Sequence, residues 1–253
     1  MKWKEIVLET GKELPSIDEV KLFAHDRETG YKAVVDKSTM DTICVIPNDY
    51  AVIEHGRVLE QIRKLEKYII KDMRLLQNGQ LFMAEVTERE PKKIELLPDD
   101  YIECGARITN NYSKDAGLSV QGYATRLVCT NGLTESKRGA KVGIKAFGTP
   151  EFSTEIEEKI EQKLNVWTDM SKLFERASKT KIHVKDMLEE HSFLPKKYMD
   201  KVIEELKDEE TLYNIWNVYT QVITHQIAPN TKTMNTIGLE KRANKILTIG
   251  MED

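Results

Sequence analysis

The order of apolar and polar residues predicts a β-rich first part of the chain. Short β-branched runs at 31–35 and 42–46 flank the turn-like sequence DKSTMD, which indicates a hairpin. The segment 101–109 alternates apolar and polar residues, so it predicts a strand with one buried face and one face toward solvent. A strand at 118–128 follows the loop NNYSKDAG. Antiparallel pairing of these last two strands would place their arginines on neighbouring strands.

One helix interrupts this β-rich part. Its apolar positions recur every three or four residues, and they are Val58, Leu59, Ile62, Leu65 and Ile69. The Asn78-Gly79 pair that follows is a strong turn signal. It predicts that a strand at 81–87 pairs with the residues near 72–76.

Helical spacing takes over after Pro150. The periodicity predicts helices at about 152–176, 183–191, 196–207, 209–225 and 239–248. The fold class predicted is therefore α+β, with a curved antiparallel sheet, an embedded helix and a helical C-terminal part. We expect two domains, residues 1–150 and residues 151–253.

Composition is that of a globular chain. Of the 253 residues, 40% are hydrophobic and 32% are charged. No apolar run reaches the ~18 residues of a membrane span, and the charged start MKWKEIVLETGKEL is unlike a signal peptide. The three cysteines form no C-x-x-C pair, which favours a reducing, cytoplasmic setting without a membrane partner. The abundance of Lys, Glu and Ile is typical of thermophiles.

Charge is distributed unevenly. The net charge of −4 argues against a protein that coats nucleic acid through bulk charge. Residues 106–150, however, carry seven basic side chains against only Asp115 and Glu135. A basic groove on an acidic body can still bind a polyanion. The alternative is a solvated basic loop. The seven are Arg107, Lys114, Arg126, Lys137, Arg138, Lys141 and Lys145.

Catalytic motifs are few. The sequence has no phosphate-binding loop, no dinucleotide fingerprint, no H-E-x-x-H and no G-x-S-x-G, so we expect no cofactor. His183 and His191 are eight residues apart, about two helical turns, which is too far to share a metal without other ligands. Cys129 is either an activated nucleophile without an evident histidine base or a small buried residue. We therefore assign no catalytic or metal-binding residue.

No other segment of the chain has so many residues with binding or catalytic potential so close together as LSVQGYATRLVCTNGL. In it, Arg126 either holds a phosphate or pairs with a buried carboxylate. Asn131 and Gly132 are expected to form a left-handed turn that redirects the chain from the sheet to a loop. Arg126, Cys129, Asn131 and Gly132 all lie in this segment.

This segment resembles the Arg-x-x-Cys-x-Asn signature of a family of phages, plasmids and mobile islands, known as domain of unknown function 932. The resemblance extends over residues 30–250. It includes YAVIEHGRVLEQIRKL, QNGQLFMAEV and the helix LYNIWNVYTQVITH with Asn217, Thr220 and His225. Relatives often carry a histidine after the basic strand, whereas this chain has KVGIKAFGT there. The resemblance implies a role in DNA replication, recombination or defence.

The function predicted is ATP-independent binding and annealing of single-stranded DNA, because the predicted fold is similar in outline to phage single-strand annealing proteins. The seven cations would track the phosphates, and Tyr112 and Tyr123 would stack on bases. One alternative is a non-enzymatic interaction or regulatory protein that forms homo-oligomers. The other is an enzyme, either a metal-dependent nuclease or a cysteine-dependent hydrolase.

Overall fold

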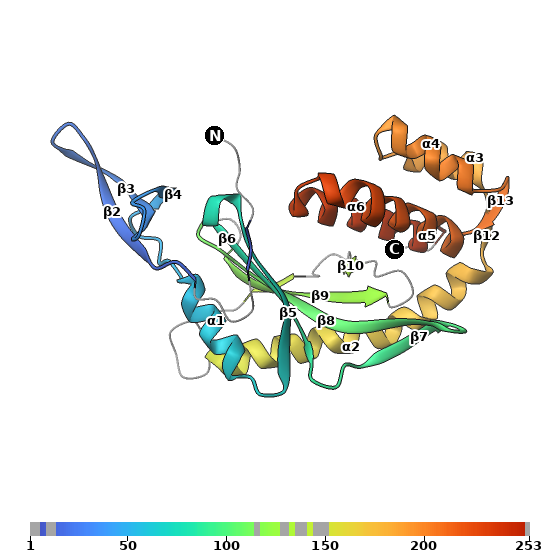
Figure 1. Ribbon diagram of the computed structural model, residues 1–253, viewed down its shortest axis with the longest axis horizontal. Coiled ribbons are helices and arrows are strands. Elements are labelled where there is room, and N and C mark those ends of the chain that lie inside the picture. Colours follow the sequence, from blue (N-terminus) through green and yellow to red (C-terminus); the bar gives the residue numbers. More distant parts are fainter. Residues whose placement is uncertain are drawn as a thin grey trace. The chain divides into compact units, whose positions relative to one another are not determined.

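The computed structural model describes residues 6–8, 14–113, 117–126, 132–134, 141–143 and 152–250. Within them the protein has the predicted α+β fold, with antiparallel sheets followed by helices (Figure 1). The chain divides into two compact units. Unit 1 contains Met1–Glu90, Ala106–Gln121 and Lys141–Gln162, and unit 2 contains Pro91–Gly105, Gly122–Ala140 and Lys163–Asp253. This division differs from the single boundary suggested at Pro150, because two β-rich segments belong with the helical unit.

Most strands belong to one open sheet. Its order is β1-β5-β6-β8-β9-β10, while β7 pairs with β8 and β11 pairs with β9. Consequently β10 and β11 lie along the outer side of β9. The bounds are β1 Ile6–Val7, β5 Tyr68–Leu76, β6 Leu81–Glu88, β7 Lys93–Leu97, β8 Asp100–Asn111, β9 Leu118–Arg126, β10 Gly132–Thr134 and β11 Lys141–Gly143.

A smaller sheet in unit 1 has the order β2-β3-β4. Its strands are β2 (Ile17–Ala24), β3 (Arg27–Asp36) and β4 (Thr42–Pro47), and β2 and β3 form a long twisted hairpin (Figure 1). The predicted hairpin at 31–46 is confirmed by antiparallel pairing of β3 with β4. Burial of Ile17, Val34 and Ile46 against Tyr112 anchors one face of this sheet.

Helix α1 (His55–Lys64) of unit 1 is shorter than its apolar spacing suggests. The helix ends before Ile69, which belongs to β5 and pairs with Thr87. The predicted pairing of 72–76 with 81–87 is confirmed. Between β5 and β6, Asn78 and Gly79 both have positive φ, as the turn signal predicts.

The alternating strand β8 is buried more completely than its sequence indicates. Ile102, Cys104, Ala106 and Ile108 are fully buried, as predicted. The opposite face was expected to meet solvent, but in unit 1 Arg107 on that face is only 5% exposed. The reason is a buried ion pair on this side of the sheet, described below.

Unit 2 contains most of the helical part of the chain. Its apolar core gathers Phe174, Tyr213 and Trp216, and the Trp216 indole donates a hydrogen bond of 2.9 Å to Asn244 Oδ1. The helices are α2 (Phe152–Lys179), which begins in unit 1, α3 (Val184–His191), α4 (Lys196–Glu205), α5 (Leu212–Val222) and α6 (Thr233–Asn244).

These helices match the predicted ones in number and order, with shifts at their ends. Short strands β12 (Lys181–His183) and β13 (Glu209–Thr211), which the periodicity does not reveal, pair with each other. A π-helical segment, Ile223–Ile227, continues α5, and α6 begins inside the polar run that was expected to separate two helices. None of the helices described is long and apolar enough to cross a membrane.

Candidate nucleic-acid interface

The basic segment 106–150 contributes strands β9, β10 and β11 at one side of the large sheet. The predicted adjacency of β8 and β9 is confirmed, because the two strands are neighbours in the strand order. Asn111 N–H donates to Gly117 O, and the hydroxyls of Thr109 and Ser119 lie 2.9 Å apart. This register places Arg107 opposite Gln121, not beside Arg126.

Arg107 is a buried partner of a carboxylate. Its guanidinium donates to Glu85 Oε1 from Nε at 3.0 Å and from Nη2 at 2.6 Å. The Arg107 and Glu85 side chains are only 6% and 12% exposed. A charge removed from water in this way needs its counter-charge close by. The prediction that Arg107 contacts phosphates is therefore wrong.

Tyr112 is likewise a core residue. The side chain is 1% exposed, and its ring stacks on His55 at 3.8 Å between centroids with an interplanar angle of 10°. The hydroxyl accepts a hydrogen bond from the backbone N–H of His55, which begins α1. Burial raises the pKa of this hydroxyl. A ring enclosed in this way cannot stack on a base, so the predicted stacking role of Tyr112 is wrong.

His55 organises this part of unit 1, and its sequence context gave no sign of that. Nε2 donates to the Gly79 carbonyl at 3.0 Å, because that oxygen can only accept. Nδ1 therefore accepts from Asn110 Nδ2 at 2.8 Å, and the same amide nitrogen donates to Ile53 O at 2.7 Å. Burial lowers the pKa of His55 to about 3. The imidazole is thus a neutral link between α1, the turn before β6 and the end of β8.

Three predicted contact residues remain on described strands. Tyr123 is half-buried and lies opposite Thr134, where β10 pairs with β9. Arg126 is the last residue of β9. Lys141 begins β11 and pairs with Gln121 of β9. Lys114, Lys137, Arg138 and Lys145 lie outside the described residues.

The motif after Arg126 is only partly described. Cys129 and Asn131 lie outside the described residues, whereas Gly132 is the first residue of β10 and pairs with Thr125. The chain therefore reverses after β9 and returns to the sheet. Gly132 therefore lies in a strand and does not lead into a loop, whereas the left-handed turn predicted at Asn131 lies outside the described residues.

The other residues that carry the family resemblance have separate settings in unit 2. Thr220 is buried in α5 and its hydroxyl donates to Asn217 O at 2.9 Å. His225 is exposed on the π-helical segment. Thr220 and Asn217 thus interact within one helix, whereas His225 lies on the surface.

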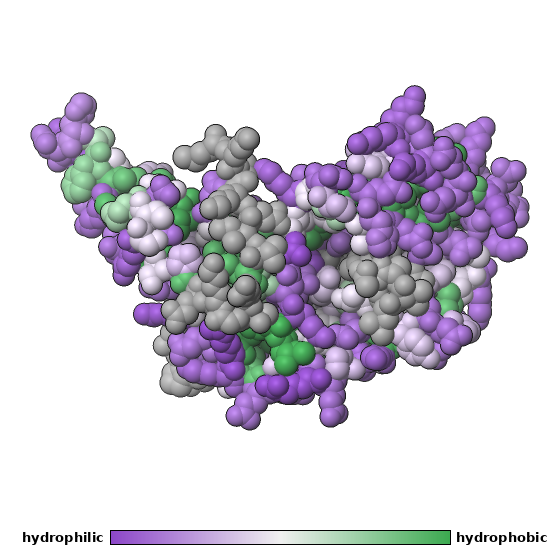
Figure 2. Space-filling view, in the orientation of Figure 1, coloured by the Kyte–Doolittle hydropathy of each residue, from purple (hydrophilic) through white to green (hydrophobic). Residues whose placement is uncertain are grey.

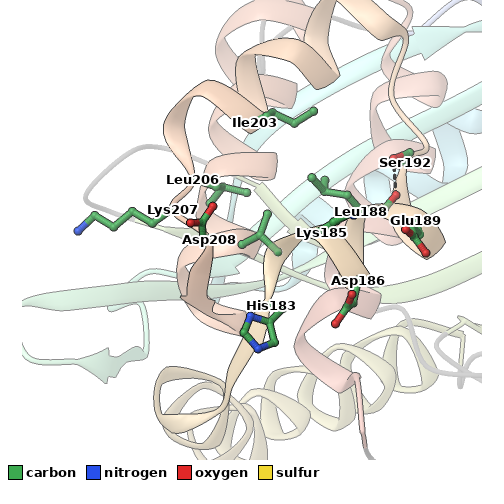
Figure 3. Close-up of a pocket in the computed structure, with 11 residues that line it drawn as sticks. His183, Lys185, Asp186, Leu188, Glu189, Ser192, Ile203, Leu206, Lys207 and Asp208 are labelled. Atoms are coloured by element: carbon green, nitrogen blue, oxygen red, sulfur yellow. Dashed lines mark hydrogen bonds between the residues drawn. The ribbon is translucent and has the colours of Figure 1, made fainter.

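A groove of about 870 Å³ lies between α3 and α4 in unit 2 (Figure 3). Leu188 and Leu206 line it together with acidic residues, and Lys207 points away from it. His183 and His191 are at opposite ends of α3, as their spacing implies. The described residues contain no group of three or more His, Cys, Asp or Glu side chains arranged to hold a metal ion.

The described cysteines have no activated setting. Cys104 is fully buried, and burial raises the pKa of Cys44 to about 11. The Cys44 thiol therefore stays protonated at neutral pH, which does not favour nucleophilic chemistry there.

Comparison of the chain with protein-family models, curated proteins and solved structures gives no match. The resemblance to domain of unknown function 932 and to phage annealing proteins therefore stays a prediction from the sequence.

Proposed function

We propose that the chain is a cytoplasmic protein of a phage, virus or plasmid that binds single-stranded DNA along the outer side of β9. One observation carries the proposal. The segment with the strongest basic bias in the chain supplies the strands β10 and β11 that lie there. Without Arg107, six basic residues still stand against Asp115 and Glu135 between 106 and 150.

The burial of Tyr112 changes the expected mode of binding. Single-strand binding proteins combine cations that follow the phosphates with aromatic rings that stack on bases. Of the two tyrosines predicted for stacking, only the half-buried Tyr123 remains. Binding would therefore depend mainly on phosphate contacts, and the bases would stay available for pairing with a complementary strand. This supports ATP-independent annealing of the bound strand as the activity of the protein.

Fluorescence anisotropy with labelled single-stranded and duplex oligonucleotides, at two salt concentrations, tests the proposal. We expect tight, salt-sensitive binding of the single strand, faster annealing of complementary strands, and intact DNA on a gel afterwards. Absence of binding at low salt would refute the proposal. Degraded DNA would replace it with the nuclease alternative.

A role as an interaction protein is the second candidate, and a different observation favours it. The small sheet β2-β3-β4 exposes apolar side chains.

A further inference from the structure

Exposed apolar side chains are concentrated on the small sheet of unit 1. Figure 2 shows this as green on the hairpin of β2 and β3. Most of the large hydrophobic residues that are exposed in the described chain lie in or beside its three strands. They are Val20, Phe23, Tyr31, Met40 and Val45, with exposed fractions from 43% to 67%. Such a concentration marks an interaction site more often than a free surface.

The cross-strand register places several of these residues in one row. Val20 lies opposite Ala33, and Ala33 lies opposite Val45, so the three share one face of the sheet. Tyr31 is on the same face because it is two residues from Ala33 along β3.

Strand β2 is the edge of this sheet. Its only strand partner among the described residues is β3. An edge strand of eight residues offers unpaired backbone N–H and C=O groups to another strand. Proteins commonly protect such an edge with proline, but β2, with the sequence IDEVKLFA, has none.

Charges on β2 are ordered around Val20. Glu19 precedes it and forms an ion pair with Lys32 of β3. Lys21 follows it and pairs with Glu28 of β3 at 3.1 Å. One strand edge therefore presents a carboxylate and an ammonium group on either side of an exposed valine.

We propose that two copies of this chain associate by antiparallel pairing of their β2 strands, with Val20 opposite Val20 at the two-fold axis. In this register Glu19 of each copy faces Lys21 of the other. If the two-fold axis passed through residue 19 of β2, Glu19 would lie opposite Glu19. If it passed through residue 21, Lys21 would lie opposite Lys21. Because like charges directly opposite each other are destabilising, charge complementarity favours the register centred on Val20 over both of these neighbours.

The same register extends the ion pairs already present in each copy. Across the new pair, charges alternate in the order Glu28, Lys21, then Glu19 and Lys32 of the second copy. The two-fold axis produces this order twice. The row of Val20, Ala33 and Val45 also becomes continuous across both copies, and the two Val20 side chains contact each other. The occupant of the edge is therefore a second copy of this chain, and the inference does not depend on nucleic-acid binding.

Sedimentation velocity over a range of concentrations tests the proposal with two charge-reversal variants. In the homodimer, Glu19→Lys places a new lysine opposite Lys21 twice, and Lys21→Glu places a new glutamate opposite Glu19 twice. We expect each variant to raise the dimer dissociation constant by roughly tenfold or more. Mixed together, the two variants can form a heterodimer in which opposite charges face each other at both contacts. One contact joins the two introduced side chains, and the other joins the native Lys21 of one copy to the native Glu19 of the other. The mixture should therefore regain the dimer.

Glu60→Lys and Lys64→Glu are the matched controls, because they break an exposed ion pair of α1 instead. They should leave association unchanged. The regained heterodimer also shows that neither variant is misfolded. The proposal is overturned if the wild-type chain stays monomeric at every concentration, if the single variants associate like the wild type, or if the mixture does not associate.

Discussion

Replacing Arg107 by methionine distinguishes a buried ion pair from a phosphate contact. In the structure the change leaves the Glu85 carboxylate, which is 12% exposed, without its counter-charge. Breaking a buried pair in this way costs about 3–5 kcal/mol of folding stability. For a chain of this size that corresponds to a fall in melting temperature of about 6–20 °C. Thermal melting followed by circular dichroism measures it, and nucleic-acid affinity of the remaining folded protein should not change.

A neighbouring ion pair provides the matched control. Arg74 Nε lies 2.6 Å from Asp72 Oδ2, but these side chains are 32% and 24% exposed. Arg74→Met should therefore cost about 1 kcal/mol or less. Removing both buried charges, with Glu85→Leu and Arg107→Met together, should recover most of the lost stability. The reasoning is refuted if Arg107→Met melts like the wild type and loses salt-sensitive binding, because Arg107 would then be an exposed phosphate ligand.

The remaining predictions concern His55 and the basic segment. His55 has a pKa of about 3 when folded, below the ordinary value of 6.5, so the unfolded chain binds its proton first as pH falls. Stability should therefore decrease between pH 6.5 and about 3, by up to ~1.4 kcal/mol per pH unit, and urea titrations of His55→Gln should show a weaker pH dependence; an unaltered dependence would contradict this. The same variant should lose about 1–3 kcal/mol at pH 7, because the Asn110 amide loses the ring nitrogen that accepts its hydrogen bond; a denaturation midpoint equal to that of the wild type would argue against the link. For DNA binding, neutralising Lys137 and Arg138 together should reduce the slope of log affinity against log salt by about 1.4. Lys196→Gln with Lys197→Gln, an equal change of charge on α4, should leave the slope as it is, and equal slopes for both double variants would exclude the basic segment as the contact.

The sequence predicts best those elements whose apolar pattern and turn residues lie within one short segment. The hairpin of β3 and β4 follows from two β-branched runs around a turn, and α2 follows from a long apolar stripe. Strand β2 was missed because an edge strand need not bury alternate residues, and most of its side chains are exposed. The end of α1 was missed because Ile69 fits a helical spacing, while its pairing with Thr87 places it in a sheet.

The candidate site could be predicted less well because burial depends on distant residues. Arg107 looks like a solvent-facing cation in an alternating strand until Glu85, twenty-two positions away, is placed on the neighbouring strand. Tyr112 looks like a loop aromatic until His55, fifty-seven positions away, stacks on it. A polar residue within an otherwise apolar strand, such as Glu85 in LFMAEVTE, is the signal that could have indicated a buried ion pair.

The two proposals depend on different forces, so salt separates them. Binding of single strands through phosphate contacts releases counterions, and its affinity falls steeply as salt rises. Self-association through β2 would combine backbone hydrogen bonds and contact between valines with two Glu19–Lys21 contacts per dimer, and only those ionic contacts are screened. Moderate salt should therefore remove the DNA while much of the dimer remains. A dimer that dissociates in parallel with the DNA would indicate that the nucleic acid itself joins the two copies, and that β2 does not.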